Sequence, residues 1–515
     1  MQRVAGTTTS RGVTLDEGPS RKGSARGRRY SRALFAGALL LAVPLAFSSV
    51  NLPVWLYLLV SLAELWLCAR YLAQRYLLIG AFGFALSSVF ALGSWIAFLG
   101  RSSLSFKGML RAEVFYNDAV MAALKVLLIA TIAYFALCEE LRPSGQLYWN
   151  PPDPVERAAA RAAVYVLLPL GVALTALTAG GSSIIAHRYV GAADAPPVID
   201  SGGLAFAGPV FFALTVIAAA RAFGSNSATY RVTLTVVLLL VGTFKFMRGE
   251  RAGTLVIVVA IFCVHLLSRR KHRLIDKLKL IGALAAVGLT FQVWADVRVH
   301  AAEYGLWPAT ESAFSNLAAM SNSTGDWTID PLRIQLVPAG FWHTLQCVDM
   351  RATGLGPGAS GFYSLPLLAL PSPLLDLARI ERPRMGALLF QQYRISNGGL
   401  FILAEGFWYG GMIGAVVVAA ALALILCGME RYLRKGVPLS SAALLAFAGS
   451  AGFGVFYGIQ PLIKAIELTA LLILCTRYLV NRKSKRRRAT TGAQTPGFPA
   501  GSALWATPPA VRGQS

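Results

Sequence analysis

A short polar turn between two apolar segments holds the first residues that could do chemistry. Arg248, Glu250 and Arg251 stand within four positions, between apolar runs at 231–247 and 252–268. Ionisable groups at a membrane boundary are costly and are often functional. An arginine offers a planar fork of donors that matches a phosphate or a carboxylate. The turn therefore predicts an anion-binding or catalytic site, and the alternative is a set of snorkelling anchors at a helix end.

A second group of polar residues lies in the long segment between residues 298 and 399. Arginine recurs there, together with histidine, aspartate and tyrosine, and an anionic ligand would explain that recurrence. For any single member the alternative is an ordinary solvated loop charge. The candidate substrate-binding residues are Arg298, His300, His343, Asp349, Arg351, Arg382, Arg384, Tyr393 and Arg394.

One acid follows that segment directly. Glu405 lies at the start of a strongly apolar run, in the sequence Gly398-Gly399-Leu400-Phe401-Ile402-Leu403-Ala404-Glu405. A carboxylate held in an apolar setting suits a general base. Helix capping or pairing with a nearby arginine is the alternative, and the sequence leaves both open.

These residues must be positioned by membrane helices. Apolar residues make up 56% of the chain and charged residues only 14%, whereas soluble proteins average roughly 25% charged residues. We expect about twelve spans, because each apolar run approaches the length that a bilayer core requires. They lie at 33–50, 52–69, 76–100, 118–138, 160–180, 204–221, 231–247, 252–268, 276–296, 400–427, 439–458 and 462–480.

The positions of the cations predict the orientation. Residues 1–32 and 482–515 are basic, disordered in composition, and expected in the cytoplasm, because cytoplasmic segments carry the excess of Lys and Arg. The second, sixth, eighth and tenth turns are basic, as the rule requires, and the third turn, with Arg101, Lys107 and Arg111, is an exception. The prediction is an all-α polytopic bundle in a bacterial inner membrane. Helices one to nine occupy 33–297, a large periplasmic loop with short helices occupies 298–399, and helices ten to twelve occupy 400–481.

Several classes of function are disfavoured. The charge of +24 sits in tails and short turns, which argues against nucleic acid as a partner. The six cysteines form no C-x-x-C pair, so we expect no zinc or redox centre. No P-loop, G-x-S-x-G, H-E-x-x-H or D-x-D motif is present, and no cleavable signal peptide is expected.

Two segments carry a resemblance to a known family. Arg251-Ala252-Gly253-Thr254-Leu255 resembles an Arg-x-x-x-Leu signature found where an external turn enters a helix. The run from Ala404 to Gly410, followed by Gly414, resembles an Ala-Glu-x-Tyr-x-Asn-Phe-Gly pattern, although no asparagine follows Tyr409. The chain thus resembles the O-antigen polymerase (Wzy) and oligosaccharide repeat-unit polymerase family of bacterial envelopes.

The resemblance implies a membrane glycosyltransferase. Such enzymes polymerise oligosaccharide repeat units, carried on undecaprenyl diphosphate, into O-antigen or exopolysaccharide at the periplasmic face, with no nucleotide and no metal cofactor. It implies the bilayer, the lipid-linked oligosaccharide, a chain-length regulator and a flippase as partners. Arg248 and Arg251 would stabilise the diphosphate, and Glu405, Glu250 or His343 would accept the proton.

The sequence is also compatible with three other functions. An O-antigen ligase-like enzyme would use the same donor with a different acceptor. A transporter or flippase of lipid-linked sugars would show internal repeats and charges at mid-membrane, and we find no such repeat. A non-catalytic envelope scaffold is the last alternative.

Overall fold

The computed structural model describes most of the apolar helices of the chain. Its continuous segments are 51–99, 103–107, 112–143, 154–179, 204–241, 251–268, 336–354 and 400–434. Short stretches and single residues are described at 37, 44, 48, 152, 297, 305, 307–312, 314–315, 377–379, 455–456, 458–459, 462–463, 466 and 474.

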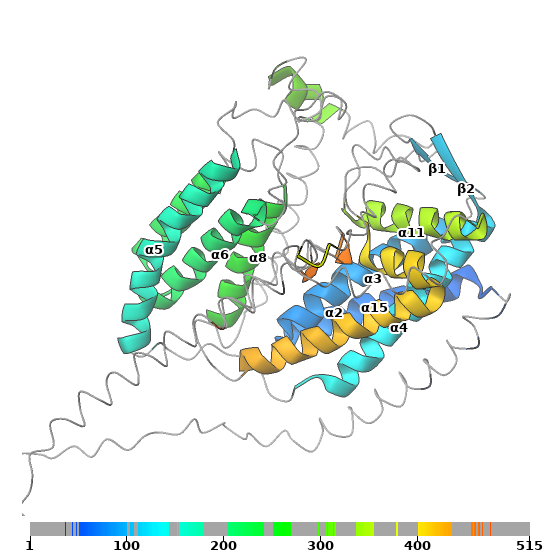
Figure 1. Ribbon diagram of the computed structural model, residues 1–515, viewed down its shortest axis with the longest axis horizontal. Helices are drawn as coiled ribbons and strands as arrows, with labels where there is room; N and C mark the ends of the chain where they lie inside the picture. Colours follow the sequence, from blue (N-terminus) through cyan, green and yellow to red (C-terminus); the bar gives the residue numbers. More distant parts are fainter. Residues whose placement is uncertain are drawn as a thin grey trace, which may run out of the picture.

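Eight predicted spans correspond to helices in the structure (Figure 1). They are α2 (Val54–Ala73), α3 (Leu77–Phe98), α4 (Asn117–Leu141), α5 (Pro154–Ala179), α6 (Leu204–Phe223), α7 (Ala228–Val241), α8 (Arg251–Ser268) and α15 (Ile402–Arg434). A further helix, α11 (Leu336–Ala352), lies inside the segment predicted as a large loop.

Five helices of the described part are long and apolar enough to cross a membrane: α2, α3, α4, α5 and α15. Shorter apolar helices occur within α6, α7 and α8. The protein is therefore a helical membrane protein. The count of twelve stays a prediction, because the spans expected at 33–50, 276–296, 439–458 and 462–480 lie outside the described residues except for isolated positions.

One element departs from the all-α prediction. Strands β1 (Ser103–Lys107) and β2 (Ala112–Tyr116) pair antiparallel, with Ser103 opposite Tyr116 and Lys107 opposite Ala112. This hairpin occupies the third turn, which the sequence analysis treated as a plain connection. The described fold is thus helical apart from this one ribbon.

The helices pack in two groups. Helices α2, α3, α4, α11 and α15 form one group, and α5, α6, α7 and α8 form the other (Figure 1). On α2 the exposed large side chains are Trp55, Leu59, Leu62 and Trp66, which recur at helical spacing and so form one face. Apolar side chains exposed along a spanning helix are what contact with lipid tails requires.

Hydrogen bonds and ion pairs connect the helix ends that the orientation rule assigns to the cytoplasmic side of the membrane. Arg431 Nη2 donates to the carbonyl oxygen of Leu141, 2.7 Å away. The backbone N–H of Leu78 donates to Glu430 Oε1 at 2.7 Å. The end of α4, the start of α3 and the end of α15 therefore meet. The same holds in the second group, where Arg221 at the end of α6 pairs with Glu156 at the start of α5.

Helix α15 is not the single straight span that the sequence predicts. Gly410 (φ −134°, ψ 17°) and Gly411 (φ 60°, ψ −148°) are non-helical. In a continuous helix, residues eight apart are separated by about 12 Å along the axis. Yet a Cβ on Gly406 would lie only 2.8 Å from the carbonyl oxygen of Gly414. Residues 402–409, the short limb, therefore fold back on residues 412–434, the long limb.

Candidate functional site

The short limb of α15 packs against α11 in a parallel ladder. The backbone N–H of Phe401 donates to His343 Nδ1 at 3.3 Å. One turn further along both helices, the carboxylate of Glu405 acts electrostatically on the thiol of Cys347. After another turn, Arg351 Nη1 donates to the carbonyl oxygen of Trp408 at 2.9 Å. Spacings of four residues along α11, and of four and then three along the α15 side, place these groups on two facing stripes.

Glu405 is the carboxylate of this interface. The side chain is buried, with 6% of the residue exposed. Its Oε2 accepts a hydrogen bond of 2.5 Å from the backbone N–H of Ile459. Its Oε1 has no hydrogen bond to a described residue and is not among the fully buried polar atoms. One oxygen is thus fixed by the backbone, whereas the other has no hydrogen-bond partner in the described part of the chain, as a proton-accepting base requires.

Gly458 explains how the backbone reaches this carboxylate. It has φ +100°, and a Cβ at this position would lie 2.6 Å from Glu405 Oε2. Any other residue would therefore be strained and would collide with the carboxylate. Gly458 does not stand out in the sequence, because its importance depends on Glu405, which is far away along the chain.

His343 is buried and neutral. Its Nδ1 accepts from Phe401, so the ring proton lies on Nε2, which has no partner among the described residues. Burial lowers the pKa of His343 to about 3, because the charged imidazolium is poorly solvated there. A group that binds protons so weakly at neutral pH is a poorer general base than Glu405.

Three of the predicted residues, His343, Asp349 and Arg351, lie on one helix but do not form one cluster. The three residues share α11, but Asp349 is exposed whereas His343 is buried against the short limb. Arg351 lies two turns beyond His343. Its guanidinium caps the last carbonyls of the short limb and stacks over Phe407 at 5.7 Å, which is a structural role.

Two buried polar groups of the interface were missed. Burial, and then the nearby Glu405 carboxylate, raise the pKa of the Cys347 thiol. Tyr409, one turn after Glu405, is buried and its hydroxyl has no partner among the described residues. The available signal was spacing: Cys347 is four residues after His343, and Tyr409 is four residues after Glu405.

The remaining predicted residues are not tested by the structure. Arg251 begins α8, as the resemblance implies, but its side chain lies outside the described residues. The candidates wholly outside them are Arg248, Glu250, Arg298, His300, Arg382, Arg384, Tyr393 and Arg394.

In the described segments, no group of three or more His, Cys, Asp or Glu side chains is arranged to hold a metal ion.

Comparisons with known proteins give no family. No protein-family model, no curated protein and no solved structure matches this chain.

Proposed function

We propose that this protein is a polysaccharide polymerase, which joins oligosaccharide repeat units carried on undecaprenyl diphosphate. The observation that carries the proposal is the buried carboxylate of Glu405, anchored through Oε2 and without a hydrogen-bond partner at Oε1 among the described residues. It lies in the short limb, just before the long limb of α15, in the segment that resembles the polymerase family. A lipid-borne substrate can approach such a site sideways from the bilayer.

The proposed reaction is a glycosyl transfer. Glu405 accepts the proton of an acceptor hydroxyl on the incoming repeat unit, whose oxygen attacks the anomeric carbon of the donor chain. A new glycosidic bond forms, the anomeric carbon–oxygen bond to the diphosphate breaks, and the diphosphate leaves as an anion. Because the diphosphate is itself the activated leaving group, no nucleotide is needed. Arg248 and Arg251 are the proposed groups that stabilise its charge.

The packing of α8 supports this assignment of Arg251. Cys263, in the C-terminal half of α8, lies within electrostatic range of Glu430, near the end of α15. The C-terminal parts of the two helices are thus neighbours. This is consistent with the N-terminal end of α8, at Arg251, facing the same side as the reversal of α15.

The proposal includes the finer topology predicted above. The chain would cross a bacterial inner membrane about twelve times, with both tails in the cytoplasm. The Glu405 end of the bundle would face the periplasm, where the segment 298–399 covers the sugar. A flippase would deliver the lipid-linked units, and a chain-length regulator would act with the polymerase.

Deletion of the gene, followed by gel analysis of surface glycans, tests the class of function. We expect single repeat units on the surface glycolipid in place of a ladder. A surface without any repeat unit would indicate a ligase, and a block in export would indicate a transporter. Either result would overturn the proposal.

Complementation of the deletion strain tests Glu405 itself. Glu405→Gln keeps an acceptor for the N–H of Ile459 but cannot take a proton, so we expect polymerisation to fall by about 10²–10⁴-fold at unchanged protein level. Glu64→Gln is the matched control. Glu64 is equally buried and accepts from Thr131 Oγ1 at 2.8 Å and Ser87 Oγ at 3.2 Å. A full ladder from Glu405→Gln would rule out Glu405 as the base.

A further inference from the structure

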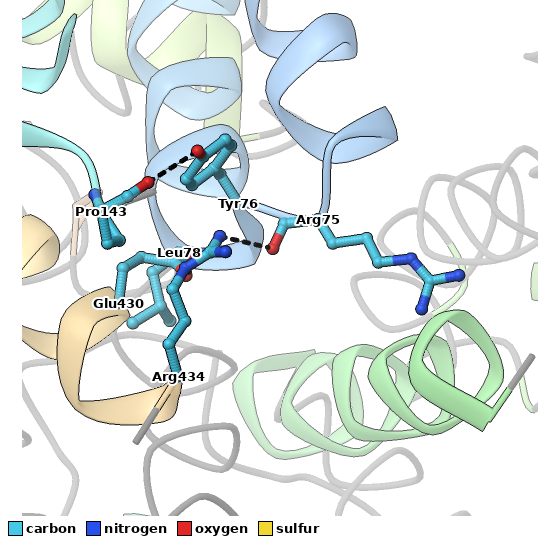
Figure 2. Close-up of polar contacts among 6 residues, drawn as sticks. All are labelled: Arg75, Tyr76, Leu78, Pro143, Glu430 and Arg434. Carbon is cyan, nitrogen blue, oxygen red and sulfur yellow. Dashed lines mark hydrogen bonds and ion pairs between the residues drawn. The ribbon is translucent and has the colours of Figure 1, made fainter. Parts of the chain in front are cut away.

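A second buried polar cluster lies at the opposite end of the α2–α3–α4–α15 group, away from Glu405. Tyr76, at the start of α3, donates its hydroxyl proton to the carbonyl oxygen of Pro143 at 2.7 Å. The guanidinium of Arg434 lies 4.3 Å from the centre of the Tyr76 ring. Figure 2 shows these side chains together, with the Arg75 side chain pointing away from them.

Arg142 is the unusual member of this cluster. Its side chain is only 7% exposed, and it follows the last residue of α4. The guanidinium stacks against Tyr71 and Tyr76, 5.6 Å and 5.7 Å from their ring centres. Nη2 pairs with Glu139 Oε2 at 2.9 Å, whereas Nε and Nη1 have no hydrogen-bond partner among the described residues. A buried guanidinium with unmet donors is costly.

The nearby carboxylates do not supply the missing acceptors. Glu430 accepts from the backbone N–H of Leu78 through Oε1, and its Oε2 lies 3.8 Å from Arg434. Glu139 accepts the hydroxyl proton of Tyr71 at 2.6 Å. Glu430 therefore serves donors other than Arg142, and Glu139 pairs with Arg142 only through Nη2, so neither carboxylate meets Nε or Nη1.

A second arginine, at the end of α15, lies beside Arg142. Arg431 is exposed, and its guanidinium donates to the carbonyl oxygen of Leu141, the residue before Arg142. Arg142, Arg431 and Arg434 thus converge at the ends of α4 and α15. Clusters of arginine between membrane helices suit the phosphate of a lipid head group.

We propose that Arg142, together with the exposed Arg431 beside it, binds a phosphate group. Nε and Nη1 lie on different edges of the guanidinium, and each offers an N–H donor that a phosphate oxygen can accept. The phosphate can come from an anionic lipid head group or from a soluble phosphate compound. This site is separate from the proposed glycosyl-transfer site and does not depend on it.

Lipid binding to the full-length protein in a neutral detergent tests the proposal. Native mass spectrometry with added cardiolipin is compared with phosphatidylcholine, and inorganic phosphate and pyrophosphate are titrated separately by thermal shift. Arg142→Gln should weaken the binding by about tenfold, the loss expected for one charge-assisted contact. Arg231→Gln, an exposed arginine on α7 whose Nη2 contacts only the carbonyl oxygen of Asn226 among the described residues, should leave it unchanged.

Glu139→Gln separates a binding role from a structural one. The amide still accepts from Tyr71, but it no longer competes for the guanidinium, so phosphate binding should tighten by about tenfold. This variant also remains informative if Arg142→Gln fails to fold. A cardiolipin response alone assigns the phosphate to a lipid, and a pyrophosphate response alone assigns it to a soluble compound. Unchanged or weaker binding in Glu139→Gln, or no response to any phosphate, would overturn the proposal.

Discussion

Four ionisable side chains in the described part of the chain, each buried or half-buried, contact backbone groups of other elements. Each such contact satisfies a peptide group near a helix end, where the ladder of helical hydrogen bonds leaves donors and acceptors unmet. Because apolar surroundings make unmet polar groups costly, these contacts fix how the helix ends meet. The pairs are Glu405 with Ile459, Glu430 with Leu78, Arg351 with Trp408, and Lys125 with Ser48.

The neutral state of His343 predicts a loss of stability in acid. With its pKa near 3 in the folded protein, against roughly 6.5 when unfolded, only the unfolded chain takes up a proton between these values. Stability therefore falls as the pH drops below about 6.5, by on the order of 2–3 kcal/mol at pH 4.5. Thermal unfolding in detergent from pH 7.5 to 4.5 measures this loss.

His343→Asn provides the matched variant for this measurement. Its side-chain oxygen can accept from the N–H of Phe401 but does not titrate. The melting temperature of this variant should depend less on pH than that of the wild type. Equal pH dependence in the two proteins would show that His343 is not the group responsible.

At the scale of elements, the reversal of α15 depends on glycine. Gly411 has φ +60°, and a Cβ there would lie 3.4 Å from Arg351 Nη2, the group that caps the short limb. Without this reversal, Glu405 could not face Cys347 while the long limb packs on α4. The turn and its arginine cap thus position the candidate base.

Gly411→Ala should destabilise the protein by about 1–2 kcal/mol, because an L-residue is strained in the left-handed region. Gly428→Ala lies in the regular part of the same helix, where a new methyl group would meet no neighbour within 4 Å. That control should be neutral or stabilising by up to about 1 kcal/mol. The melting temperatures of the Gly411→Ala and Gly428→Ala variants, measured in the same detergent, compare the two effects. Equal effects of the two substitutions would contradict a strained turn at Gly411.

Apolar runs predicted most of the described helices but not their interruptions. The run at 400–427 has continuous helical character, so the reversal at Gly410 and Gly411 was missed. A glycine pair inside a helix is compatible with either a bend or close packing, and only the contact of Gly406 with Gly414 decides between them. The β1–β2 hairpin was missed because its two strands are short and lie between two long apolar runs.

At the scale of the whole molecule, local patterns identified the candidate base but not the groups around it. Glu405 stands out in sequence, because it is an acid in an apolar run. The role of Arg351 depends on carbonyl groups of another helix, more than fifty residues away, and the sequence carries no sign of that contact. Arg142 was overlooked for the same reason, since its partners come from α2 and α3.

The proposed function depends on which side of the membrane holds the Glu405 end of the bundle. The contacts at Leu78, Leu141 and Glu430 show that the opposite helix ends meet. The orientation rule predicts that those ends face the cytoplasm. It follows that α11 and the short limb would face the periplasm, where the lipid-linked glycan is presented.

Cysteine labelling of intact cells with a membrane-impermeant maleimide tests this most directly. Ala352, at the end of α11, and Ala73, at the end of α2, are exposed, and the five native cysteines in the described part are buried. In a Cys475→Ser background, Ala352→Cys should be labelled from outside, and Ala73→Cys only after the membrane is permeabilised. The reverse pattern would place Glu405 on the cytoplasmic side and contradict the proposed polymerase.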